Sequence, residues 1–183
     1  SDLVMRVMVP LAEGLEEIEA VTIIDVLRRG GIDAVSVALG PDRAVRGSRG
    51  VTILADTLWP AEGEFEAIVL PGGGKGTENL AADARVLETL REFDADGKFV
   101  AAVCAAPTVL AAAGLLRGRR ATCYPACAAE LGEAYDNVPA VADGNIITGQ
   151  GPGSAMLFAL VLVTHFADEP TARRVADDLL TSL

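Results

Sequence analysis

Short, strongly apolar runs recur along this chain, and each is followed by a turn and then by a segment with helical spacing. Strands buried on both faces of a parallel sheet have this continuous apolar character, because helices cover both sides. The pattern therefore predicts an α/β fold in which a mostly parallel sheet has helices on both faces. The runs expected to form strands are Val4–Leu11, Ala34–Leu39, Ala67–Leu70, Phe99–Val103 and Ile146–Thr148.

Helical spacing separates these runs, and two segments depart from the alternation. Ala44–Asp56 alternates around two glycines, which favours a small hairpin at the sheet edge. Ala121–Tyr124 is short and predicts a further strand. No linker interrupts the pattern, so we expect a single domain over residues 1–183. The expected helices are Ile18–Leu27, Arg85–Asp94, Thr108–Ala113, Ser154–Phe166 and Thr171–Leu180.

The composition limits the classes of partner. Hydrophobic residues make up 51% of the chain and aromatic residues only 4%, so the core must be built mainly from aliphatic side chains. The net charge of −11 repels nucleic-acid phosphates and anionic membrane surfaces. Two long uncharged stretches, Phe99–Leu116 and Gly144–Ala167, are interrupted by prolines, glycines or polar residues and are not expected to span a membrane.

Three cysteines are too few for a disulfide scaffold, which favours a cytoplasmic protein. Cys123 and Cys127 are four residues apart without a second pair or a nearby histidine, so no metal site is expected. His165 is the only histidine and lies near the end of an apolar segment, where we expect it to cap a helix. A cysteine hydrolase normally needs a histidine base beside its thiol, so peptidase chemistry is disfavoured.

Four turns follow predicted strands and should meet at the carboxyl edge of the sheet, where α/β proteins bind ligands. They are Glu13–Glu19, Pro71–Gly76, Cys104–Pro107 and Gly149–Ser154. The glycine-rich Pro71–Gly76 lacks the spacing of a phosphate loop. Its N–H groups could hold an oxyanion, although a plain tight turn is the ordinary alternative.

Cys104 lies between alanines where a strand should turn into a helix, an arrangement similar to a nucleophile elbow. A thiolate there would face the positive end of the helix, so we expect a lowered pKa. The alternative is a structural cysteine in an alanine-rich core.

Four glutamates crowd the start of the first helix: Glu13, Glu16, Glu17 and Glu19. Carboxylates at this position complement the helix dipole and need no further function. Glu19 shares a helical stripe with apolar residues and could be partly buried with a raised pKa. The other glutamates also have apolar neighbours at helical spacing, so the periodicity does not choose among them.

Six ordered motifs carry a resemblance to a known family. They are Ala12–Glu19, Asp25–Ile32, Ser48–Val51, Val69–Gly73, Ala101–Thr108 and Gly151–Gly153. On these residues the chain resembles the ThiJ/PfpI superfamily, in particular the branch of the parkinsonism-associated protein deglycase and its bacterial YajL-type members. The resemblance implies a flavodoxin-like three-layer sandwich that forms a homodimer and uses no cofactor.

The resemblance also assigns roles residue by residue. Cys104 matches the reactive cysteine, and Glu19 matches the glutamate whose protonated carboxyl bonds the thiolate or its sulfinate. The N–H groups of Gly73 and Ala105 match the oxyanion-holding pair. Tyr124 stands where many members have a histidine, which weakens a histidine proton relay. The residues matched to the pocket are Gly72, Arg49, Tyr124, Gln150 and Pro152.

This resemblance implies an enzyme that acts on reactive dicarbonyls such as methylglyoxal, or on their early adducts with amines and thiols, in stress protection. The alternative is a non-enzymatic oxidative-stress sensor or holdase chaperone that uses oxidation of Cys104. A cysteine peptidase or amidase is disfavoured, and a flavin binder is suggested by the fold alone. Cys123 is a candidate to resolve an oxidised Cys104, but alternation along a strand would place it on the opposite face from Tyr124, which disfavours this role.

Overall fold

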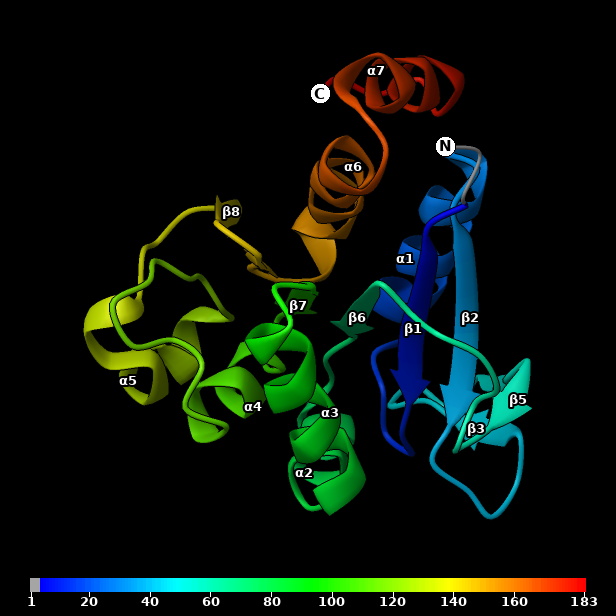
Figure 1. Cartoon of the computed structure of the whole chain (residues 1–183), viewed down its shortest axis with the longest axis vertical. Coiled ribbons are helices and arrows are strands. Elements are labelled where there is room, and N and C mark those ends of the chain that lie inside the picture. Colours follow the sequence, from blue (N-terminus) through cyan, green and yellow to red (C-terminus); the bar gives the residue numbers. More distant parts are fainter. Residues whose placement is uncertain (1–3) are drawn as a thin grey trace.

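A seven-stranded sheet forms the centre of the molecule in the computed structural model, which describes residues 4–183. Its strand order is β5-β2-β1-β6-β7-β9-β8 (Figure 1). All neighbouring strands are parallel except β8, which runs antiparallel to β9. The strands are β1 (Arg6–Leu11), β2 (Asp33–Ala38), β5 (Thr57–Leu58), β6 (Ala67–Leu70), β7 (Phe99–Val103), β8 (Ala140–Asp143) and β9 (Ile146–Gly149).

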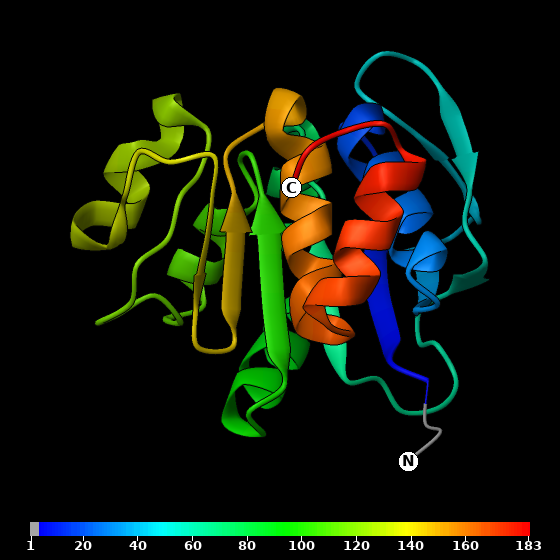
Figure 2. The same cartoon turned by 90° about the horizontal axis from the view of Figure 1, so that it is seen from above.

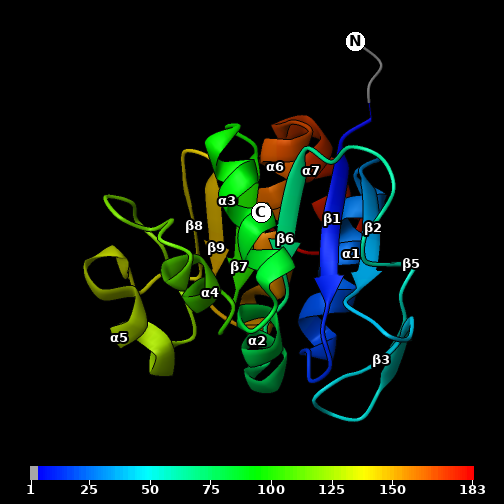
Figure 3. The same cartoon turned by 60° about the horizontal axis from the view of Figure 1, so that its bottom comes forward.

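Helices cover both faces of this sheet. One face carries α1 (Glu17–Arg29), α6 (Ala155–Phe166) and α7 (Glu169–Asp178), with α6 and α7 in front of the sheet in Figure 2. The other face carries α2 (Gly74–Ala81), α3 (Ala84–Ala95) and α4 (Pro107–Ala112), which come forward in Figure 3, and α5 (Ala128–Leu131) lies beside α4. The protein is thus a flavodoxin-like three-layer sandwich, as the sequence predicts.

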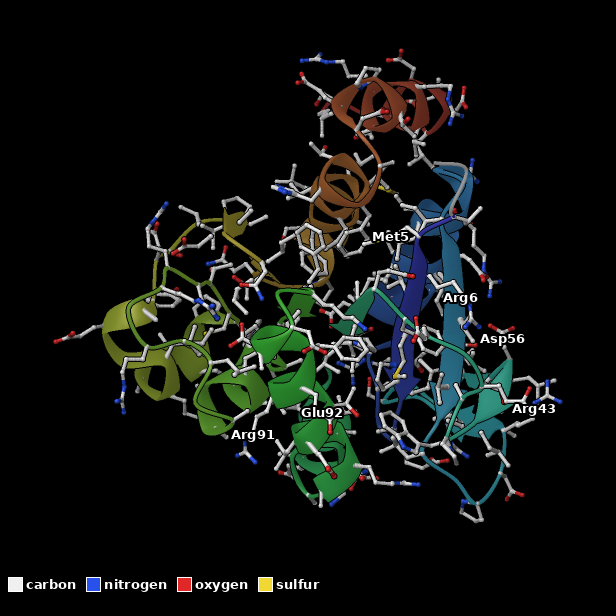
Figure 4. The ribbon with its side chains drawn as sticks, viewed as in Figure 1. Met5, Arg6, Arg43, Asp56, Arg91 and Glu92 are labelled. Carbon is white, nitrogen blue, oxygen red and sulfur yellow. The ribbon has the colours of Figure 1, made fainter. Side chains whose placement is uncertain are left out.

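Alternate residues of each strand feed two separate hydrophobic clusters, because successive side chains of a strand point to opposite faces. Val7 and Val9 pack with α1 and α6 in the first cluster, which we call the α1 core. Met8 and Ile68 pack with α3 and α4 in the second, the α4 core. The charged side chains labelled in Figure 4 lie outside both clusters: Arg6 on β1, Arg43 and Asp56 beside β5, and Arg91 and Glu92 on α3.

The predicted hairpin is confirmed as an antiparallel pair, β3 (Ala44–Arg46) and β4 (Thr52–Leu54), in a sheet of its own. The strand predicted over Ala121–Tyr124 is wrong, since this segment forms only an isolated bridge between Ala121 and Tyr135. Both edges of β9 are already paired, with β7 and β8, so this segment cannot add a ladder to β9. The Thr122 N–H instead donates to the Thr148 hydroxyl, at 2.9 Å.

The chain crosses over at β1. It leaves β1 to form β2 on one side and later returns to place β6 on the other side. Ligand sites of open α/β sheets lie beyond the carboxyl ends of strands at such a crossover. No helix within residues 4–183 has both the length and the apolar character needed to cross a membrane.

Candidate active site

The turns that follow β1, β6 and β7 converge, as predicted from the sequence. The Gly72 N–H, just after β6, donates to Glu19 Oε1 at 2.9 Å. A Cβ added at Gly72 would lie 2.7 Å from the same oxygen and 2.8 Å from the Cβ of Cys104. Gly72 therefore packs closely against both the Glu19 carboxyl group and the Cβ of Cys104. The fourth turn joins through the Cys104 N–H, which donates to the Gly149 carbonyl at 3.0 Å.

Cys104 occupies the sharp corner that the sequence predicts. Strand β7 ends at Val103 and α4 begins at Pro107. The φ angle of Cys104 is 65°, in the left-handed region that non-glycine residues rarely enter. Such a conformation costs about 1–3 kcal/mol and persists only when the surroundings enforce it. Cys104 is partly buried rather than fully enclosed.

Glu19 is the glutamate that the helix places in the core. Its side chain is 0% exposed, and Leu15, Ile23 and Val26 on the same stripe are also buried. Burial raises its pKa to about 7, against the opposing effect of hydrogen bonds from Cys104 and Gly72. Oε1 accepts the Gly72 N–H, whereas the buried Oε2 has no well-formed partner within residues 4–183. This oxygen is the free hydrogen-bonding group of the site.

The expected lowering of the Cys104 pKa is wrong. Burial and the charge of Glu19 raise the pKa of this thiol to about 12, and the N–H groups of Ala105 and Gly73 only partly offset them. Helix α4 has six residues and starts three residues after Cys104, so its dipole has little effect on the thiol. Above about pH 7 the pair is therefore a thiol beside a carboxylate, and the carboxylate is positioned to take the thiol proton.

The N–H groups of Gly73 and Ala105 both stabilise negative charge on the sulfur, consistent with the pair matched by resemblance. Gly73 has a φ of 95°, and a Cβ there would lie 2.5 Å from the Gly14 carbonyl oxygen. Only glycine can therefore hold this N–H next to the thiol. The oxyanion role of the two groups stays a prediction.

The remaining predicted pocket residues divide into two groups. Tyr124 lies at the site, because its N–H donates to the Cys104 carbonyl at 2.8 Å. Its exposed ring lies next to Gly151, where an added Cβ would be 3.7 Å from the ring, and Pro152 follows directly in the chain. Gln150 instead directs its amide to Asn137, at 2.7 Å. Arg49 is exposed and binds Glu17 through its backbone N–H, so within residues 4–183 neither polar side chain forms a hydrogen bond with the thiol.

The role of Glu17 could not be predicted from the sequence. Its carboxylate is 9% exposed and accepts the Arg49 and Val51 N–H groups at 2.8 and 3.1 Å. The Ser48 hydroxyl donates to the same carboxylate. Burial opposes ionisation, but these donors hold the pKa of Glu17 below its ordinary value. Glu17 thus ties the turn between β3 and β4 to the start of α1, a contact between segments that local spacing does not reveal.

No imidazole lies near the thiol. His165 is exposed in the last turn of α6, and its ring meets Phe99 edge-on, with 6.1 Å between centroids. Phe99 begins β7 whereas Cys104 follows its end, a separation of roughly 16 Å at about 3.3 Å per residue. Histidine-assisted peptidase chemistry is therefore not supported. Within residues 4–183, no group of three or more His, Cys, Asp or Glu is placed to hold a metal ion.

Alanine in place of Gly72 should destabilise the protein by about 2–3 kcal/mol, because the added methyl group clashes with Glu19, Cys104 and the Val103 carbonyl. Chemical denaturation of the wild type and the variant measures this loss. The matched control is Gly74→Ala, since a Cβ at Gly74 meets nothing within 4 Å. Equal stability of the two variants would contradict the packing described here.

Comparison with known proteins connects this geometry to a family. The chain is 40% identical over 180 residues to Protein dj-1beta of Drosophila melanogaster, covering 96% of both chains. It is 34% identical to the Parkinson disease protein 7 homolog of Danio rerio, again over 96% of both. The solved structure of oxidized DJ-1 from Toxoplasma gondii superposes with a TM-score of 0.94 at 37% identity, covering 98% of this chain and all of that one. The DJ-1/PfpI family profile matches residues 5–165, which include Glu19, Gly72 and Cys104, and the chain therefore belongs to the DJ-1/PfpI family.

Proposed function

We propose that this protein is a cysteine-dependent enzyme that converts reactive dicarbonyls such as methylglyoxal into hydroxy acids without a cofactor, and that also acts on their early adducts with amines and thiols. The observation that carries the proposal is the pairing of Cys104 with the buried Glu19, whose pKa is raised to about 7. A base with a pKa near the working pH is effective in proton transfer. The partly buried thiol beside it is an available nucleophile.

The proposed reaction begins when the Cys104 sulfur attacks the aldehyde carbon and the thiol proton passes to Glu19. The N–H groups of Gly73 and Ala105 stabilise the oxyanion that forms on the aldehyde oxygen. Glu19 returns the thiol proton to this oxyanion, which gives a hemithioacetal and restores the carboxylate. The Glu19 carboxylate then moves a proton from the former aldehyde carbon to the neighbouring carbonyl carbon, while the hydroxyl proton passes from the former aldehyde oxygen to the neighbouring oxygen, which leaves a thioester of lactate. Water cleaves this thioester, releases lactate and restores the thiol, so the net reaction adds one water to methylglyoxal.

The direct test is to incubate the purified protein with methylglyoxal and measure the loss of the dicarbonyl together with the formation of lactate. Equal amounts of the two support the proposal. Loss of methylglyoxal without lactate would mean that the protein is merely modified by the aldehyde, and the proposed activity would be rejected.

A second candidate function is oxidation sensing by the same cysteine, alone or coupled to holdase activity. The free Glu19 Oε2 favours it, because a protonated carboxyl oxygen could donate to a sulfinate on Cys104. The similar Toxoplasma gondii DJ-1 structure is described as oxidized, which lends support by analogy. The chemistry consumes two molecules of hydrogen peroxide per thiol and produces one sulfinic acid and two waters.

Mild peroxide is expected to add two oxygen atoms to Cys104, because Glu19 and the two N–H groups stabilise the sulfinate. Intact-mass analysis and peptide mapping measure the gain and locate it. The Cys104→Ser variant should not show it. A peptide map that places the oxygens on Cys123 or Cys127 instead, or no gain at all, would argue against sensing.

The exposed side of α1 and the β3–β4 hairpin supports a homodimer. Ile18 and Val21 on α1 are 56% and 50% exposed, and Val51 and Leu54 on the hairpin are 55% and 65% exposed. A groove of about 560 Å³ between these elements also carries acidic and basic side chains, including Asp25 and Arg28. A face with both charges and exposed apolar residues can pair with a second copy of itself.

We expect light scattering to give a mass of about twice 18.9 kDa for the wild type. Leu54→Asp should shift the protein toward the monomer, because the new charge would be buried at the interface. The control is Leu180→Asp, a change at a residue that is 93% exposed on the far end of the chain. A monomeric wild type at micromolar concentration would reject the dimer.

A further inference from the structure

Cys123 and Cys127 form a second thiol centre that the proposed reaction does not use. They stand on either side of Tyr124, and both are free thiols. Cys123 is 0% exposed, whereas Cys127 is only partly buried. Cys127 is thus partly accessible to solvent, whereas Cys123 is fully buried.

A single reverse turn brings these two residues together. The Cys127 N–H donates to the Tyr124 carbonyl at 2.8 Å, and Pro125–Cys127 form one turn of 3-10 helix. Both cysteines pack on the α4 core, so their side chains point to the same face. The charge of Cys127 also raises the pKa of Cys123, after burial, which places the two sulfurs in each other's electrostatic field.

The same packing separates the pair from Cys104. Cys104 packs against the α1 core, on the opposite face of the sheet. Cys127 rather than Cys104 is therefore the thiol that packs on the same face as Cys123. Two thiols also make an incomplete metal site, and Glu130, the nearest acidic group acting on them, completes no cluster of three within residues 4–183.

We propose that Cys123 and Cys127 are a modification site at which a peroxide-class oxidant forms an intramolecular disulfide. Hydrogen peroxide first oxidises the accessible Cys127, forming a sulfenic acid and one water. The Cys123 sulfur then attacks the Cys127 sulfur, the S–S bond forms and the S–O bond breaks. The departing hydroxide takes the Cys123 proton and leaves as a second water, so two thiols and one peroxide become one disulfide and two waters.

A disulfide requires Cβ atoms about 3.5–4.5 Å apart, and the helical elements that hold the two cysteines are short. The turn leads into α5, which has only four residues, and the residues between the two cysteines are exposed. The bond would fix the turn that holds Tyr124, whose N–H donates to the Cys104 carbonyl. The modification therefore lies on the rim of the candidate active site without involving its thiol.

The test uses the full chain with Cys104→Ser, which leaves only this pair of thiols. The protein is treated with one equivalent of hydrogen peroxide, denatured, blocked with N-ethylmaleimide and analysed by intact mass and non-reducing peptide mapping. We expect loss of two hydrogen atoms, loss of both maleimide-reactive thiols and a peptide linked through Cys123 and Cys127. A reductant should restore both thiols.

The matched control is Cys104→Ser with Cys127→Ser, which should retain one reactive thiol and form no internal disulfide. Oxygen addition to either cysteine without loss of hydrogen would overturn the proposal, as would two thiols that remain reactive after the treatment. Disulfide-linked dimers in place of the internal bond would overturn it as well. Because the wild-type Cys104 is absent throughout, none of these results depends on the proposed dicarbonyl activity.

Discussion

Serine in place of Cys104 is expected to lower the kcat/KM for methylglyoxal by about 1000-fold or more, because the hydroxyl is a far weaker nucleophile than the thiol at neutral pH. Serine has nearly the same size as cysteine and can keep the hydrogen bond from residue 104 N–H to the Gly149 carbonyl. The change should therefore remove the chemistry while leaving the corner in place. Lactate formation over a range of methylglyoxal concentrations gives the measurement.

Cys127→Ser is the matched control for this experiment, because it makes the same chemical change at a partly buried thiol outside the candidate active site. We expect it to retain the wild-type turnover. Thermal unfolding of both variants would show whether either change disturbs the fold. Turnover by Cys104→Ser equal to that of the wild type would remove the thiol from the mechanism.

Glutamine in place of Glu19 is expected to lower kcat/KM by about 100-fold, the typical contribution of a positioned acid or base. The glutamine oxygen can still accept the Gly72 N–H, so the packing survives while the base is lost. The wild-type kcat/KM should rise with pH and reach half of its maximum near pH 7, as Glu19 ionises. The variant should lack this rise. The control is Glu13→Gln, because Glu13 is an exposed glutamate in the same turn.

The raised pKa of Glu19 also has a consequence for stability. Its folded pKa of about 7 exceeds the ordinary value of 4.5, so the folded state binds a proton more tightly than the unfolded chain. Its contribution to the free energy of unfolding is complete below about pH 4.5 and falls as the pH rises to about 7, by up to roughly 3 kcal/mol. Subtracting the unfolding curves of Glu19→Gln from those of the wild type isolates this change. A difference that does not vary with pH would show that Glu19 is not buried as a titrating acid.

The elements that depend on local apolar pattern were predictable from the sequence, whereas those that depend on long-range contacts were not. The run Ala67–Leu70 became β6 with the same bounds, and the spacing of Ile18–Leu27 predicted most of α1. The whole of α2 is absent from the sequence prediction, because Gly74 and Gly76 disfavour a helix in isolation. Strand β8 was missed because Ala140–Asp143 is only partly apolar and is stabilised by pairing with β9.

The candidate site shows the same division. Cys104 lies just after the end of a strand, as the apolar run before it and the alanines around it predict. Family resemblance selected Glu19, whereas helical periodicity could not choose among the four glutamates. The direction of the Cys104 pKa could not be predicted, because it depends on the burial of the thiol and on the charge of Glu19, a residue 85 positions earlier in the chain. The partners of Gln150 and Arg49, Asn137 and Glu17, come from distant segments for which the sequence gives no pairing signal.

The close approach at Gly72 limits how this centre can vary. The gap between Glu19 Oε1 and the Cβ of Cys104 at this position holds only a hydrogen atom on the main-chain carbon of Gly72, and every other amino acid is larger. Side-chain variation therefore offers no gradual way to widen or narrow that gap. Differences in substrate preference between relatives would therefore have to arise at the edge of the candidate active site, at positions such as Tyr124. The spacing between residues 19 and 104 would stay constant.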